Sequence, residues 1–98
     1  MSDTKLQLNG NVLTINGELT RHTITRGFEK TSKKFQSTAL TSVDLAQVSR
    51  IDTAGLAWLL SLVESAKRAG NELSFSPVSD DLLRLAKLTG VESFLQRQ

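Results

Sequence analysis

The residues best placed for chemistry are Asp52 and Thr53, which stand where a strand-like segment gives way to a helix-like one. Both side chains carry oxygens that can accept the free amide hydrogens of a first helical turn, so both are good N-cap residues. An exposed hydroxyl at such a helix start lies where the helix dipole favours negative charge. The pattern is commonly no more than a capped turn. It also suits a phosphorylation switch or a contact with a partner.

The rest of the sequence offers little that could catalyse a reaction. It has one histidine, His22, and no cysteine, which excludes disulfide and thiolate chemistry. We find no metal-ligand spacing, no glycine-rich phosphate loop and no nucleophile paired with a histidine. His22 lies in a polar stretch near a predicted helix start, so we expect it to be exposed and structural. The sequence predicts neither an enzyme nor a cofactor site.

Length and charge narrow the function classes further. A chain of 98 residues with a net charge of +2 predicts one domain without a strongly basic surface. The basic cluster of Arg26, Lys30, Lys33 and Lys34 is typical of a solvated helix face. Nucleic-acid binding would require more charge and more aromatic residues, whereas an anionic membrane or an acidic partner stays open. The polar N-terminus and the absence of a long apolar run predict no signal peptide and no membrane span.

The elements that must position Asp52 and Thr53 begin with a hairpin. Leu6 and Leu8 alternate with polar residues, Asn-Gly-Asn at 9–11 signals a turn, and apolar residues resume at 12–15. After the Gly-Glu-Leu-Thr segment at 17–20, Ile24, Phe28 and Phe35 recur at helical spacing and predict a first helix.

Strands and helices then alternate to the end of the chain. A central strand is predicted at roughly 39–45, a loop that Val48 and Ile51 hold in place follows, and a helix spans 53–69 before Gly70 and Asn71 end it. A further strand is predicted at 72–75. This order predicts an α/β domain with a mixed sheet.

A third helix is predicted after Ser79, a good N-cap residue, and Gly90 ends it. Its apolar face is expected to consist of Leu82, Leu85, Ala86 and Leu88. The tail from 91 to 98 contains apolar residues that suggest packing back on the domain.

The helix at 53–69 has an apolar arc wider than one sheet face usually covers. At about 100° per residue, its core face consists of Leu56, Leu59, Val63 and Ala66. Trp58 and Leu62 extend that face on one flank, either as core residues packed on a neighbouring helix or as a secondary docking surface. Thr53 lies on the opposite flank, beside Ala57, Leu60 and Glu64.

Two motifs resemble the signature of STAS domains, whose best-known members are the anti-sigma-factor antagonists of spore-forming bacteria. Gly-Glu-Leu at 17–19 is similar to the family's Gly-Glu-Leu-Asp segment. Residues 43–56 are similar to its Val-x-Asp-Leu-Ser-x-Val-x-x-Ile-Asp-Ser-Ser-Gly-Leu signature. The resemblance covers essentially the whole chain. It implies a single STAS domain over 1–98, with a mixed, mostly parallel sheet, an N-terminal hairpin, and three or four α-helices packed mainly on one face.

Residues 55–62, 66–71 and 85–88 most resemble one branch of that family, the small STAS subunit of the Mla phospholipid-transport ABC complex of Gram-negative bacteria. The resemblance implies a cytoplasmic, non-enzymatic adaptor without cofactor, held by the transporter at the cytoplasmic face of the inner membrane. Such an adaptor binds the ATPase subunit, within a complex with permease and substrate-binding subunits, and supports its assembly and activity. The complex maintains outer-membrane lipid asymmetry.

The same resemblance assigns the site residues. Thr53 occupies the position of the phosphorylatable serine of the antagonist branch, and in the transporter branch a threonine at this place lies near the ATPase. Asp52, Ala54 and Ala57 are expected to join it in partner binding or phosphorylation, with Asp44 as an acidic neighbour.

The alternative function is an anti-sigma-factor antagonist regulated by phosphorylation at Thr53, with a kinase as partner. Thr20 stands where the family motif continues with Asp, which in the antagonists belongs to the acidic surround of the phosphorylation site. This difference favours the transport interpretation.

Overall fold

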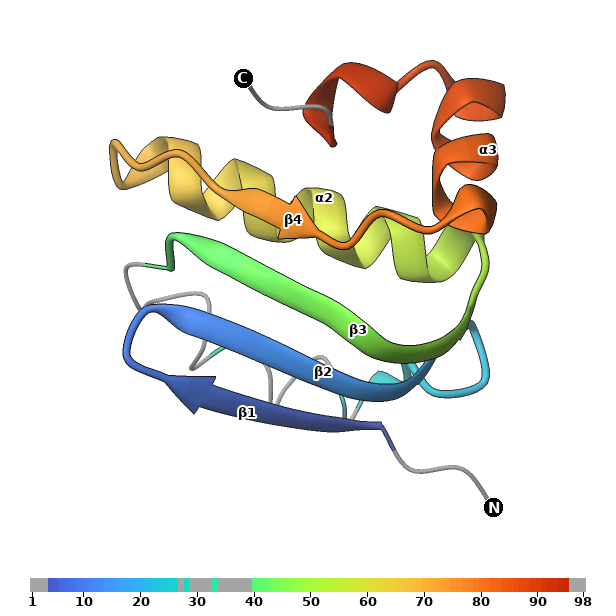
Figure 1. The fold of residues 1–98 in the computed structure, drawn as a ribbon, viewed down its shortest axis with the longest axis horizontal. Coiled ribbons are helices and arrows are strands. Elements are labelled where there is room, and N and C mark those ends of the chain that lie inside the picture. The colour runs from blue at the N-terminus through green and yellow to red at the C-terminus, as the bar shows by residue number, and fades with distance from the viewer. Residues whose placement is uncertain (1–3, 27, 29–32, 34–39, 96–98) are drawn as a thin grey trace.

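The computed structural model describes residues 4–26, 28, 33 and 40–95 (Figure 1). These residues form four strands, two α-helices and one 3-10 helix. In chain order they are β1 (Lys5–Asn9), β2 (Val12–Leu19), β3 (Ser42–Ile51), α2 (Thr53–Arg68), β4 (Ser74–Ser76), α3 (Asp80–Thr89) and η1 (Glu92–Phe94). The α/β class is confirmed, although the described part has fewer α-helices than the three or four expected. The predicted first helix falls mostly outside the described residues. Within it, the structure describes Arg26, Phe28 and Lys33, and these three are helical.

The sheet has the order β1-β2-β3-β4. The hairpin prediction is confirmed, since β1 and β2 pair antiparallel with Leu8 opposite Leu13. β2 pairs with β3, and β3 with β4, in parallel. The sheet is therefore mixed and mostly parallel, as expected.

The central strand is longer than predicted. β3 continues to Ile51, so Val48 and Ile51 belong to the strand and not to a loop. The sequence does not predict the second half of β3, because apolar and polar residues do not alternate there. Its exposed residues are Ala46, Gln47, Ser49 and Arg50. Pairing with β2 holds it in the sheet through two register shifts, and such irregularities bend a strand.

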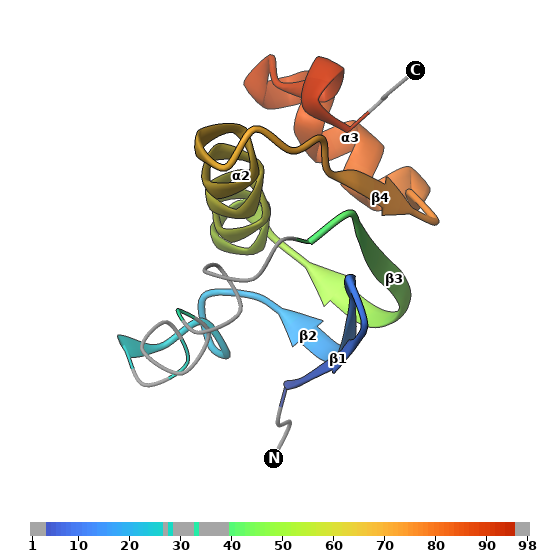
Figure 2. The same ribbon diagram turned by 90° about the vertical axis from the view of Figure 1, so that its left-hand side faces the viewer.

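The core lies between the sheet and α2. Alternate residues of β2 and β3 are buried, among them Leu13, Ile15 and Val43, because side chains of a strand alternate between its two faces. Figure 2 looks along α2 and shows it lying over one face of the sheet. Leu56 and Leu59 of α2 face this core, at 2% and 0% exposed.

The helix ends follow their predicted caps. Asp52 and Ser79 cap α2 and α3 through side-chain hydrogen bonds, and Gly90 ends α3 with a left-handed φ of 76°. The predicted face of α3 is wrong at one position, because Leu88 is 78% exposed. Leu82 and Ala86 are its buried residues. The predicted last strand is shifted to Ser74–Ser76, where β4 can pair with the first half of β3.

Candidate functional site

The start of α2 is held by one carboxylate. Oδ1 of Asp52 accepts hydrogen bonds from the backbone N–H groups of Ala54 and Gly55, at 2.9 and 3.1 Å. Oδ2 accepts a third from the backbone N–H of Arg21, at 3.0 Å. Asp52 therefore ties the helix start to the turn that follows β2, a link between segments 31 residues apart. The sequence indicated the cap but gave no sign of the bond to Arg21.

These contacts set the charge of Asp52. Burial opposes the charged form, but the backbone N–H groups of Arg21, Gly55 and Ala54, together with the charge of Arg21, outweigh it. The pKa of the Asp52 carboxyl is consequently held below its ordinary value, as expected for a carboxylate that accepts several backbone hydrogen bonds. A negative charge therefore stays at the N-terminus of α2, where the helix dipole stabilises it.

Gly55 lets α2 approach the end of β2. A Cβ at this position would lie 2.0 Å from the backbone oxygen of Leu19 and 2.8 Å from its carbonyl carbon. The same oxygen accepts the backbone N–H of Asp52, at 3.1 Å. Close packing explains the glycine at position 55, and together with the Asp52 bonds it sets the position of the first turn.

Thr53 is the first residue of α2 and is exposed. Its hydroxyl forms no hydrogen bond with any residue that the structure describes. Ala57 is exposed one turn further along, Leu60 is half-buried and Glu64 is exposed. We call these four residues, Thr53, Ala57, Leu60 and Glu64, the α2 stripe. The structure thus places Asp52, Thr53, Ala54 and Ala57 at one helix start.

Asp44 is not part of this site. It lies in the half of β3 that pairs with β4, whereas Thr53 follows the other end of the strand, roughly 20 Å away at the usual rise per residue. Its carboxylate accepts the backbone N–H of Ala46, at 2.9 Å, within the irregular part of β3. Asp44 therefore has a local role in the strand.

Trp58 and Leu62 are core residues. They are 5% and 1% exposed, and the Trp58 ring packs on Phe28 with centroids 5.2 Å apart. The folded chain therefore presents neither of them as a docking surface, and both belong to the core.

The turn after β2 lies beside the site. Thr20 is 6% exposed, and its hydroxyl contacts a carboxylate oxygen of Glu18 at 3.5 Å and accepts the backbone N–H of His22 at 3.3 Å. Position 20 therefore contributes a buried hydroxyl to the turn and no acidic group to the surroundings of Thr53. His22 is exposed, as predicted.

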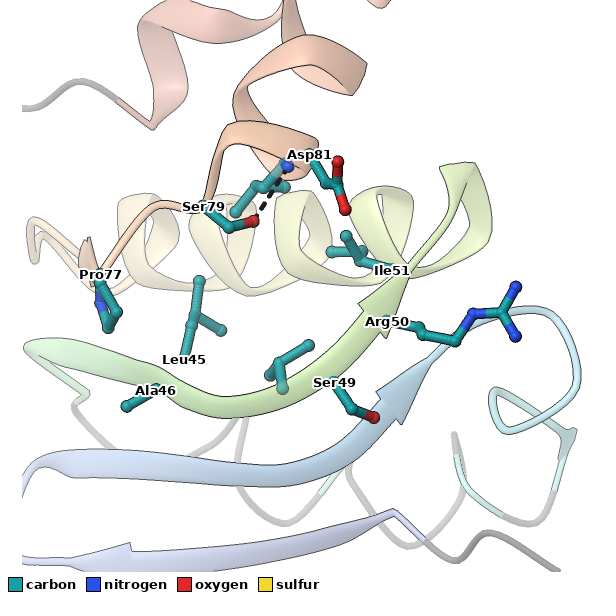
Figure 3. A pocket seen from close by; sticks show the side chains of 10 residues that line it. Leu45, Ala46, Ser49, Arg50, Ile51, Pro77, Ser79 and Asp81 are labelled. Carbon is teal, nitrogen blue, oxygen red and sulfur yellow. Dashed lines mark hydrogen bonds between the residues drawn. The ribbon is translucent and has the colours of Figure 1, made fainter.

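The described residues show no cluster of metal-binding side chains. They contain no group of three or more His, Cys, Asp or Glu residues that could hold a metal ion. Figure 3 shows a hollow beside the second half of β3, where Pro77 lies near Leu45 and Ala46 and Asp81 lies near Ile51. The Ser79 hydroxyl there accepts the backbone N–H of Leu82, at 3.1 Å. Arg50 extends away from Asp81, so the polar groups do not converge on a common point.

Comparison with known proteins identifies the family. A family model described as "Mlab, STAS domain" matches residues 2–96. The chain is 38% identical over 79 residues to the intermembrane phospholipid transport system binding protein MlaB of Escherichia coli (strain K12), which covers 81% of this chain and 79% of that protein. The MlaB protein of Shigella flexneri matches with the same values.

Solved structures share the fold. A Thermotoga maritima protein described as an anti-sigma factor antagonist superposes with a TM-score of 0.71 at 18% identity, over 95% of this chain and 83% of the other. The unphosphorylated anti-sigma factor antagonist SpoIIAA gives 0.62 at 17% identity, over 87% and 82% of the two chains. Within the part of the chain that the structure describes, no helix is long and apolar enough to cross a membrane.

Proposed function

The chain belongs to the Mlab family of STAS domains, and from this membership we propose that it is a non-enzymatic adaptor subunit of an ABC-type phospholipid transport complex that maintains outer-membrane lipid asymmetry. It binds the ATPase subunit and supports its assembly and activity, at the cytoplasmic face of the inner membrane. The observation that carries the proposal is the exposed Thr53 at the start of a helix that Asp52 and Gly55 hold rigidly.

The α2 stripe is suited to a protein partner. Thr53 offers a methyl group and an unengaged hydroxyl, so it can pack and hydrogen-bond at once. Ala57 leaves room for a close approach, and Leu60 adds apolar area between exposed neighbours. Because the first turn is held by contacts to β2 and to the following turn, binding would order little further backbone. Such preorganisation favours affinity.

A negative charge at position 53 should weaken partner binding without destabilising the fold. Glutamate at a helix N-terminus is compatible with the helix dipole, and the side chain is exposed. At a buried interface the same charge would lose its hydration and repel nearby carboxylates. We therefore expect Thr53→Glu to weaken ATPase binding and to leave the melting temperature nearly unchanged.

The experiment is co-expression of this chain with the ABC ATPase encoded nearest to it, followed by co-purification. Wild type and Thr53→Glu are compared with Thr41→Glu, which adds the same charge at an exposed threonine before the opposite end of β3. The proposal expects capture of wild type and Thr41→Glu and loss of Thr53→Glu. Equal melting temperatures together with equal capture of all three forms would place the interface elsewhere.

A second candidate function is an anti-sigma-factor antagonist phosphorylated at Thr53. The exposed, unengaged hydroxyl supports it, as does the fold shared with such antagonists. The absence of a carboxylate at position 20 and the 38% identity to MlaB favour the adaptor. Capture of no ATPase, together with phosphorylation of wild type but not Thr53→Val by a serine kinase encoded nearby, would favour the antagonist.

A further inference from the structure

A groove lies between α2 and Phe94 of η1. It has a volume of about 420 Å³ and is lined by Ala57, Leu60, Ser61, Val63, Glu64, Lys67 and Phe94. A cavity of about 150 Å³ already accepts a benzene ring. The groove is therefore large enough for a bulky apolar side chain.

The walls of the groove combine apolar surface with one available cation. Phe94 of η1 packs partly on the core, and the Lys67 ammonium lies over its ring, 4.9 Å from the centroid. Glu64, the acidic residue of the lining, pairs instead with Arg68 at 3.8 Å. Among the described residues, Lys67 thus has an aromatic contact but no carboxylate partner.

The groove continues the α2 stripe. Ala57, Leu60 and Glu64 belong to both, and Thr53 lies one turn before Ala57 on the same line of the helix. A partner that contacts Thr53 and lies along α2 would therefore reach the groove next. This continuity, together with the positive charge of Lys67, indicates what kind of group would occupy it.

We infer that the groove between α2 and η1 receives one large apolar side chain of the ATPase partner, next to a carboxylate of the partner that pairs with Lys67. The inference rests on the proposed function and adds a specific contact to it. Large side chains seated in a pocket near the centre of an interface commonly carry much of its binding energy. The carboxylate adds electrostatic complementarity, which depends on salt.

The inference is tested by filling the groove with a larger side chain of this protein. Ser61→Phe should occupy it, whereas Ser65→Phe adds the same ring to a half-buried serine of α2 that does not line it. We expect Ser61→Phe to weaken ATPase binding at least about tenfold, measured on the folded fraction because the substitution also removes the hydrogen bond that the Ser61 hydroxyl donates to the Trp58 carbonyl oxygen. Ser65→Phe should bind as wild type, after normalisation to the folded fraction.

A second pair of variants tests the charge and does not disturb the core. Lys67 and Lys87 are both exposed lysines in the last turn of a helix, and only Lys67 lines the groove. Lys67→Glu should weaken binding several-fold, and Lys67→Gln should make the affinity less sensitive to salt. The corresponding Lys87 variants should match wild type in both measurements.

The outcomes distinguish the inference from the proposed function. If Ser61→Phe and Lys67→Glu bind as wild type while Thr53→Glu does not, the adaptor function stands and the groove contact is refuted. If wild type binds no ATPase, both fail. The inference is also overturned if Ser61→Phe abolishes only self-association measured by sedimentation, or only the binding of a fluorescent fatty acid, because the occupant is then a second copy of the chain or an acyl chain.

Discussion

Replacing Gly55 with alanine sets two physical effects against each other. Alanine is the better helix former, by about 1 kcal/mol, so helix propensity alone predicts a more stable protein. The added Cβ would however lie 2.0 Å from the Leu19 backbone oxygen, far inside any van der Waals contact. Main-chain atoms form that obstacle, so no side-chain rotation can relieve it.

The magnitude follows from what must move. The Leu19 oxygen also accepts the backbone N–H of Asp52 at 3.1 Å, and the Asp52 carboxylate holds the helix start to Arg21. Moving α2 away from β2 therefore strains several hydrogen bonds at once. Overpacking of a well-packed site typically costs about 1–3 kcal/mol and occasionally more. We expect the upper end for the clash, about 3 kcal/mol, which the gain of about 1 kcal/mol in helix propensity reduces to a net loss of about 2 kcal/mol, out of a total of about 5–15 kcal/mol for a domain.

Equilibrium urea unfolding, followed by the fluorescence of the buried Trp58, measures this loss. Ala54→Gly is the matched control. It exchanges the same two residue types in the opposite direction, in the same helical turn, and adds no atom that could clash. Helix propensity predicts that it costs at most about 1 kcal/mol. A Gly55→Ala protein as stable as wild type, or more stable, would refute the close-approach argument. At urea concentrations where the variant stays folded, its ATPase capture should still be reduced, because Thr53 is displaced.

Four further substitutions are expected to change the free energy of unfolding by different amounts. The lowered pKa of Asp52 means that its stabilisation is present above its unfolded pKa of about 3.9 and is lost as the pH falls through the folded pKa. Wild type should therefore lose more stability than Asp52→Asn as the pH falls below about 4, and parallel curves of unfolding free energy against pH would contradict this. Leu82 is 2% and Leu88 is 78% exposed. Leu82→Ala should therefore lower the free energy of unfolding by about 2–5 kcal/mol, and Leu88→Ala by less than about 0.5 kcal/mol. Similar losses for the two variants would mean that Leu88 is covered. Trp58→Ala should cost about 3–5 kcal/mol, monitored by circular dichroism, and a loss below about 1 kcal/mol would argue against its core position.

The features that could be predicted from the sequence depend on local chemistry. The hairpin follows from Asn9 and Gly10 between alternating apolar residues, and it is observed with β1 and β2 paired in register. The start of α2 follows from the capping ability of Asp52, and the end of α3 from Gly90. In each case, residues a few positions apart decide the structure.

The features that were missed depend on contacts between distant segments. The second half of β3 is a strand because β2 pairs with it, although its own residues are mostly exposed. The bond from Arg21 to Asp52 and the approach of Gly55 to Leu19 join β2 to α2, and neither has a signature in local periodicity. The groove likewise exists only because η1 places Phe94 beside α2.

The structure divides α2 between two tasks. Its inner residues, such as Leu59 and Leu62, are almost completely buried and hold the helix on the sheet. The exposed residues on the other side, Thr53, Ala57, Glu64 and Lys67, add little to that packing. Together with Leu60 and Phe94, which pack partly on the core, they place a hydroxyl, apolar surface and an ammonium group on the outer side of the helix. Because the inner contacts and the bonds of Asp52 hold the helix, substitutions on the outer side should alter partner binding with little effect on folding. A protein that acts by presenting a surface requires this separation. Thr53→Glu and Ser61→Phe test it at two points of the same helix.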